Sequence, residues 1–212
     1  MKIYYWCPFL TNIATIKSVV RSAKSISKNN KLRNIDEVTV LNSSGEWDFL
    51  KKKSSKIKIK DLYPFSFHKF LPKEGFVQSR ISFLIIFFIN FFPLMFKIQK
   101  EKPKYLIVHL LTILPIILSP LISKNTKIIL RISGLPKLTI IRIVIWKLFS
   151  RYIHKVTAPT QKTLIMLKRS KIFDQNKIIL LRDPAIDKKE ISKNKLSKLP
   201  HKFKHKTFTL SI

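Results

Sequence analysis

Short apolar runs alternate along the chain with longer stretches in which apolar residues recur at helical spacing. The runs predict strands, and the stretches predict helices. The predicted strands are 2–6, 37–41, 56–60, 105–109, 127–132, 155–157 and 177–181. The predicted helices are about 13–26, the apolar segment after Gln78, 113–122, 139–152 and 161–168. Most of the strands are apolar on both faces, so we expect one α/β domain whose parallel sheet of six or seven strands is flanked by helices on each side.

The end of the chain has a different pattern. Residues 188–206 are polar and rich in Lys, which predicts a linker. Residues 207–212 contain the apolar segment FTLSI, which predicts a strand where the sequence stops. We therefore expect a domain at 1–187, a linker at 188–206, and the first strand of a missing second domain at 207–212.

The charge of the chain is strongly positive, with 42 Lys and Arg residues against 11 Asp and Glu, a formal net charge of +31. This favours acidic partners such as phosphate or an anionic membrane, although a coding bias toward Lys, Ile and Asn would give the same composition. Only eight of the cations are Arg, and aromatic residues do not alternate with basic ones, so nucleic acid is not expected as a partner.

The sequence also carries signals of cellular location and membrane insertion. Cys7 is the single cysteine, which excludes an internal disulfide, and no secretory signal is visible, so we expect a cytoplasmic location. Segment 81–96 is apolar but has about 16 residues, fewer than the roughly 20 that cross a bilayer, and it contains Asn90 and Pro93. A buried or interfacial helix is favoured over an integral membrane protein built on 81–96 and 106–122.

Candidate chemistry lies where the strands end, because ligands of open parallel sheets bind at the carboxyl edge. After the first strand, Thr11, Asn12 and Thr15 border a helix N-terminus that could receive a phosphate or a sugar hydroxyl, although the loop has no Gly. His109 ends another strand and has Thr112 nearby. Its near-neutral pKa makes it a candidate acid, base or hydroxyl-orienting group, and a purely structural role is the alternative.

Three further strand ends carry polar residues. Arg131, Ser133 and Gly134 lie at the end of the fifth predicted strand, where Gly134 would allow a sharp turn. Thr160 and Asp183 follow the last two strands. The His residues are scattered and no Cys or His pair has the spacing of metal ligands, so we expect no metal site.

Taken in order, the segments YLIVHLLTILP, KIILRISGLP, APTQKT and LLRDPAID resemble the N-terminal half of bacterial glycosyltransferases of the GT-B fold, in the glycosyltransferase family 4 group. The resemblance covers residues 1 to about 187 and implies a Rossmann-like domain. It implies that His109 is catalytic, near the sugar and the acceptor. The substrate-binding residues implied at the other strand ends are Thr11, Asn12, Thr15, Thr112, Arg131, Ser133, Gly134, Thr160 and Asp183.

The resemblance also implies an activity, the transfer of a sugar from a nucleotide-sugar donor to a lipid-linked or polysaccharide acceptor in lipopolysaccharide or capsule synthesis. No cofactor besides the donor substrate is implied. Two motifs depart from the family: residues 12–15 replace its glycine pair, and Asp183-Pro184 replaces an Asn-Gly turn. The donor-binding domain has no counterpart, so we expect this chain to be inactive alone and to need a separate donor domain.

Basic residues repeat along the first predicted helix, opposite its apolar stripe: Lys17, Arg21, Lys24 and Lys28. They predict either a solvated face or docking to anionic lipid or a lipid-diphosphate acceptor. The second interpretation implies a peripheral protein at the inner face of the cytoplasmic membrane. The alternative to a transferase is a non-catalytic basic protein that binds a membrane surface or nucleic acid.

Overall fold

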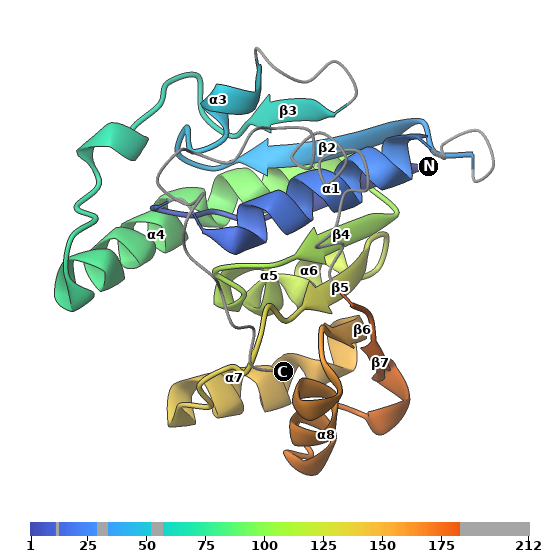
Figure 1. Ribbon diagram of the computed structural model, residues 1–212. Helices are drawn as coiled ribbons and strands as arrows, with labels where there is room; N and C mark the ends of the chain where they lie inside the picture. The colour runs from blue at the N-terminus through green and yellow to red at the C-terminus, as the bar shows by residue number, and fades with distance from the viewer. Residues whose placement is uncertain (12, 29–33, 52–56, 183–212) are drawn as a thin grey trace, which may run out of the picture.

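The computed structural model describes residues 1–11, 13–28, 34–51 and 57–182, which contain seven strands in one sheet. These are β1 (Lys2–Trp6), β2 (Glu37–Asn42), β3 (Lys58–Asp61), β4 (Tyr105–Val108), β5 (Lys127–Arg131), β6 (Ile153–Ala158) and β7 (Ile178–Leu180). Every neighbouring pair is parallel, in the order β3-β2-β1-β4-β5-β6-β7 (Figure 1). The predicted Rossmann-like α/β fold is confirmed.

Helices connect the strands at nearly the predicted places. They are α1 (Ala14–Lys28), α3 (Asp48–Lys51), α4 (Phe76–Glu101), α5 (Ile113–Ile117), α6 (Ser119–Ile122), α7 (Ile140–Phe149) and α8 (Gln161–Arg169), with short 3-10 turns at His68–Phe70, Ser150–Tyr152 and Gln175–Lys177. The helix predicted at 113–122 is divided into α5 and α6, and Pro120 lies in the first turn of α6, where its missing N–H costs nothing. The short α3 was not predicted.

The two faces of the sheet are covered by different helices. On one face, Ile16, Val19 and Ala23 of α1 pack in a cluster with Tyr5 and Val40 of the strands. On the other face, α4, α5, α6 and α7 cover a cluster that contains Tyr4, Trp6 and their neighbours in β4 and β5 (Figure 1). The chain reverses its winding direction between β1 and β4, and an open parallel sheet binds ligands at such a switch point.

Helix α4 corrects the expectation drawn from segment 81–96. It has 26 residues and is the one described helix long and apolar enough to cross a membrane, so the argument that the segment is too short was wrong. One stripe is fully buried, made of Ser82, Ile86, Asn90, Leu94 and Ile98 at intervals of four, and Phe87, Phe91 and Met95 beside it pack partly against the core. Just 28% of the most apolar window of α4 is buried, so much of the helix surface is exposed.

The side of α4 that faces away from the sheet is strongly apolar. Phe88 and Phe92 are 71% and 60% exposed. The other exposed apolar residues on this helix layer are Phe76, Val77, Ile81, Leu84, Ile89 and Phe96 of α4, Leu121 of α6, and Ile140, Ile141, Val144 and Leu148 of α7. We call this surface the α4–α7 apolar face.

The predicted linker at 188–206 and the predicted strand at 207–212 lie outside the described residues, so both stay predictions.

Candidate functional site

A cavity of about 370 Å³ opens at the carboxyl ends of β4 and β5, on the side of the switch point. The turns after these strands form one wall, and helices α4 and α7 form the other. The lining residues are Arg80, Phe83, His109, Leu110, Leu111, Thr112, Ile113, Ile132, Ser133, Gly134, Leu135, Pro136, Arg142 and Trp146. The structure thus brings together His109, Thr112, Ser133 and Gly134, four of the residues predicted from the sequence.

His109 lies at the base of this cavity and is only 4% exposed. Its backbone N–H donates to the carbonyl of Trp6 (2.9 Å), and its ring stacks on Tyr5 with 6.1 Å between centroids. Its Nε2 is buried and has no hydrogen-bond partner within the described part of the chain. The atom that could meet a substrate hydroxyl is therefore unused by the fold.

The charge of His109 differs from the expectation. Burial, helped by the positive charge of Arg131, lowers the pKa of His109 to about 3. The near-neutral pKa assumed from the sequence is thus wrong for this environment, because desolvation penalises the imidazolium. At neutral pH the ring is neutral, which suits the orientation of a hydroxyl better than the storage of a proton.

The turn after β5 forms the neighbouring wall. Gly134 has φ 147°, a conformation that a side chain would strain, and its carbonyl accepts a hydrogen bond from the Thr163 hydroxyl (3.4 Å). Thr160 caps α8 by accepting from the Thr163 N–H (3.2 Å). Thr160 therefore supports the turn through Thr163 and is not among the lining residues.

Arg131 is 6% exposed and lies beneath the cavity, not in its wall. Its charge acts on the pKa of both His109 and Tyr5, which places its guanidinium near both rings. The structure therefore shows an electrostatic effect of Arg131 on the site, and the contact with substrate predicted for this residue stays untested.

The loop after β1 lines a second, smaller cavity of about 160 Å³ that contains Thr11. Phe83 and Leu110 line both cavities, so the two are adjacent. Thr15 is half-buried on α1 and lines neither of them. Asn12 and Asp183 lie outside the described residues, so their predicted roles are untested.

Two arginines that sequence reasoning missed complete the main cavity. Arg80 comes from the first turns of α4, and Arg142 from the start of α7. Arg142 donates to the carbonyl of Lys137 (2.6 Å), and its guanidinium lies 5.6 Å from the ring of Trp146. Their signal in the sequence was weak, because nothing local shows that side chains of two separate helices meet at the end of β4.

A third cavity, of about 160 Å³, has charges that satisfy one another. Lys51 pairs with Asp48 (2.7 Å) and Asp61 (2.8 Å), and the Asn42 amide donates to both carboxylates. This network ties β2, β3 and α3 together. Because its positive and negative side chains pair with one another, the network has a structural role.

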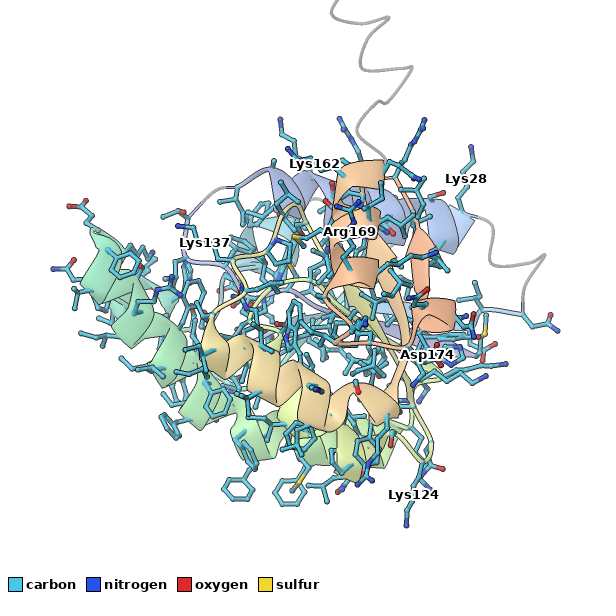
Figure 2. All side chains as sticks on the ribbon, turned by 90° about the horizontal axis from the view of Figure 1, so that it is seen from below. Lys28, Lys124, Lys137, Lys162, Arg169 and Asp174 are labelled. Carbon is cyan, nitrogen blue, oxygen red and sulfur yellow. The ribbon has the colours of Figure 1, made fainter. Side chains whose placement is uncertain are left out.

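The basic residues of α1 lie on the other side of the molecule from the α4–α7 apolar face. Lys17, Lys24 and Lys28 are exposed and Arg21 is half-buried. Figure 2 shows Lys28 of α1 and Lys124, which follows α6, on opposite sides. One flat membrane therefore cannot contact both surfaces at once. Among the described residues, no group of three or more His, Cys, Asp or Glu could hold a metal ion.

Comparison with known proteins identifies the fold. No family model matches the chain, and no curated protein matches it significantly. UDP-GlcNAc 2-epimerase from Neisseria meningitidis, bound to UDP-GlcNAc, superimposes with a TM-score of 0.58 at 18% identity, over 92% of this chain and 50% of that one. A glycosyltransferase from Rickettsia africae gives 0.54 at 14%, over 91% and 48%. The lipopolysaccharide outer core galactosyltransferase WaaB, in its apo form, gives 0.51 at 11%, over 87% and 46%.

These similarities confirm the predicted resemblance at the level of fold. The chain has the Rossmann-like architecture of one half of a GT-B structure. It spans about half the length of the solved structures that it matches.

Proposed function

We propose that this chain is the acceptor-side half of a glycosyltransferase that takes a sugar from a nucleotide-sugar donor. The observation that carries the proposal is the cavity at the carboxyl ends of β4 and β5 in a GT-B-like half. This cavity holds His109, whose Nε2 has no hydrogen-bond partner among the described residues. Two of the three similar structures are glycosyltransferases. The third contains a bound nucleotide sugar.

In the proposed reaction, an acceptor hydroxyl attacks the anomeric carbon of the donor sugar. The new bond joins the acceptor oxygen to that carbon, and the bond to the diphosphate oxygen breaks. The hydroxyl proton passes to the departing phosphate oxygen, and the nucleoside diphosphate leaves. His109 would hold the acceptor hydroxyl through Nε2, and Thr112 and Ser133 would contact the sugar rings from the wall of the cavity. Placing the hydroxyl in line with the reacting carbon contributes by orientation.

The acceptor is proposed to be lipid-linked or a polysaccharide, in the synthesis of a cell-surface glycan such as lipopolysaccharide or capsule. The similarity to a lipopolysaccharide galactosyltransferase supports this assignment. The donor nucleotide would bind mainly to a second domain, as the coverage of about half of each similar structure suggests. That domain would be a partner of this chain.

We further propose that the protein binds peripherally to the anionic inner face of the cytoplasmic membrane. The α4–α7 apolar face supports this proposal because it combines exposed apolar side chains of α4, α6 and α7 with the exposed cations Arg80 and Lys147 on the same helices. Apolar contact and attraction of these cations to lipid phosphates would act together. The basic residues of α1 would then face away from the bilayer.

Reconstitution tests the transferase proposal. The chain alone should transfer no sugar, and transfer should appear when a donor-binding domain is fused or added. His109→Ala should then reduce turnover at least about tenfold through loss of hydroxyl orientation. The exposed His154 offers a matched control, and His154→Ala should retain full turnover. Full activity of the reconstituted His109→Ala protein, or robust transfer by the chain alone, would refute the assignment.

A further inference from the structure

The main cavity carries positive charge that no carboxylate among the described lining residues compensates. Arg80 and Arg142 line it from two helices, and no carboxylate is found among the described residues of its wall. In the third cavity, by contrast, the single cation Lys51 is held between two carboxylates. Bringing two guanidinium groups together without a counter-ion is unfavourable unless a ligand supplies the negative charge.

The same cavity is lined by side-chain nitrogens that have no hydrogen-bond partner among the described residues. Arg142 Nε and Trp146 Nε1 are buried donors with no hydrogen-bond partner within the described residues, and His109 Nε2 is a third unpaired nitrogen. Trp146 lines the cavity although only 1% of its surface is exposed. Buried donors are almost always satisfied in folded proteins, so unsatisfied groups around one cavity are suited to bind an acceptor-rich ligand.

The surroundings of Arg142 agree with this geometry. Burial, together with the positive charge of Arg80, lowers the pKa of Arg142. Thr139 caps α7 by accepting from the Arg142 N–H (3.4 Å), so the side chain lies in the first turn of that helix. The positive end of the helix dipole therefore adds to the two side-chain charges.

We propose that Arg80, Arg142 and the indole N–H of Trp146 form a binding subsite for a phosphoryl group, most suitably a diphosphate, inside the main cavity. The two guanidinium groups present paired N–H donors that match phosphate oxygens. His109 lines the same cavity. A ligand held by its phosphates at the arginines would therefore present its hydroxyl-bearing part toward Nε2 of His109.

Two sources could supply this phosphate, a lipid-linked acceptor or the nucleotide-sugar donor. The subsite adjoins the α4–α7 apolar face, because Arg80 and Arg142 belong to the helices that form it. This favours a lipid diphosphate whose chain leaves along α4 and α7. The inference deepens the proposed function and rests on it only for the source of the ligand.

Calorimetric titration of the full chain with pyrophosphate tests the subsite without requiring sugar transfer. We expect saturable binding that weakens as salt is raised. Arg80→Gln and Arg142→Gln should each weaken it about tenfold, the effect of losing a hydrogen bond to a charged group. Trp146→Phe should weaken it less, because one neutral donor is lost. Arg169→Gln, at the C-terminal end of α8, is the matched control because Arg169 is exposed, and this variant should bind as the original chain does.

Titrations with farnesyl diphosphate and UDP separate the two sources. Tighter binding of farnesyl diphosphate than of pyrophosphate would assign the subsite to a lipid-linked acceptor. Tighter binding of UDP would assign it to the donor, and either result supports a phosphoryl subsite. Absence of pyrophosphate binding, or unchanged affinity in the double Arg80→Gln/Arg142→Gln variant, would overturn it.

Folding is controlled separately in this experiment. Arg80 is exposed, so its substitution should leave the melting temperature unchanged even where Arg142→Gln is destabilising. Binding is measured without a donor domain. Absence of binding would therefore contradict the proposed subsite without contradicting the proposed transferase function. If pyrophosphate binds but no sugar is transferred after reconstitution, the transferase proposal would be contradicted and the proposed subsite would be supported.

Discussion

At the scale of single residues, the pKa of His109 was the property that the sequence predicted least well. Burial and the nearby Arg131 lower its pKa to about 3, below its ordinary value of 6.5. We expect its ring signals in an NMR titration to stay constant between pH 5 and pH 8. A titration midpoint between 6 and 7, assigned by comparison with His109→Gln, would contradict the buried, neutral state.

Glu101 illustrates the opposite balance between burial and pairing. Burial opposes its ionisation, but hydrogen bonds from Lys60 (2.7 Å), Tyr4 and Lys97 outweigh this effect and lower its pKa to about 2. Lys60 also pairs with Glu37 (2.8 Å), so the group joins β1, β2, β3 and the end of α4.

We therefore expect Glu101→Gln to reduce the free energy of unfolding by about 1–3 kcal/mol at pH 7. A depressed carboxyl pKa stabilises the fold above the unfolded value of about 4.5, and this stabilisation is lost as the pH falls toward 2. The difference between variant and original should thus shrink between pH 4.5 and pH 2 in urea unfolding. The exposed Glu74→Gln is the control, and an equal loss there would show that Glu101 has no special role.

At the scale of elements, α4 combines a narrow buried stripe with a broad apolar exposed side. Ile86 and Leu94 are fully buried, whereas Phe88 and Phe92 contact little of the described protein. Local periodicity predicted the helix, but its length and the width of its exposed side were underestimated. The apolar segment of the sequence ends before Lys97 and Lys100. The helix nevertheless continues to Glu101, because Lys is a good helix former.

If α4 contacts the membrane, negative charges introduced on its exposed side should strongly reduce membrane binding. Phe88→Asp together with Phe92→Asp should reduce binding to anionic vesicles more than tenfold, because two large apolar side chains no longer enter the interface. Sedimentation with vesicles measures this, and unchanged melting temperatures would show that the fold survives.

The control for this test lies on the other side of the sheet. Lys17→Gln with Lys24→Gln on α1 should change vesicle binding far less than the α4 substitutions. If the α1 variant loses binding and the α4 variant keeps it, the membrane would face α1 instead. Resistance of the original protein to high salt and carbonate would indicate an embedded α4 and contradict peripheral binding.

For the whole molecule, the excess of 42 cations over 11 anions has a physical consequence. Self-repulsion of a net charge of +31 destabilises the compact state, and salt screens it. We expect 0.5 M sodium chloride, a concentration at which the Debye length falls to roughly 4 Å, to raise the melting temperature by roughly 3 °C. Differential scanning fluorimetry measures the shift, and a fall in melting temperature would show that favourable ion pairs dominate instead.

The sequence by itself determined the α/β class, the order of the elements and the carboxyl-end turns that carry His109, Ser133 and Gly134. These features follow from local patterns, since apolar runs form strands and the residues after them must lie at one edge of a parallel sheet. The close placement of His109 beside the turn at Ser133 and Gly134 was predictable because β4 and β5 are neighbours.

Only the tertiary structure decided the charge of His109, the place of Arg131 beneath the cavity, and the meeting of Arg80 with Arg142. It also decided that α1 and α4 lie on opposite faces of the sheet, which separates the basic helix from the apolar one. Each of these depends on packing between elements distant in the chain. Burial and long-range charge act through space, so no local pattern carries them.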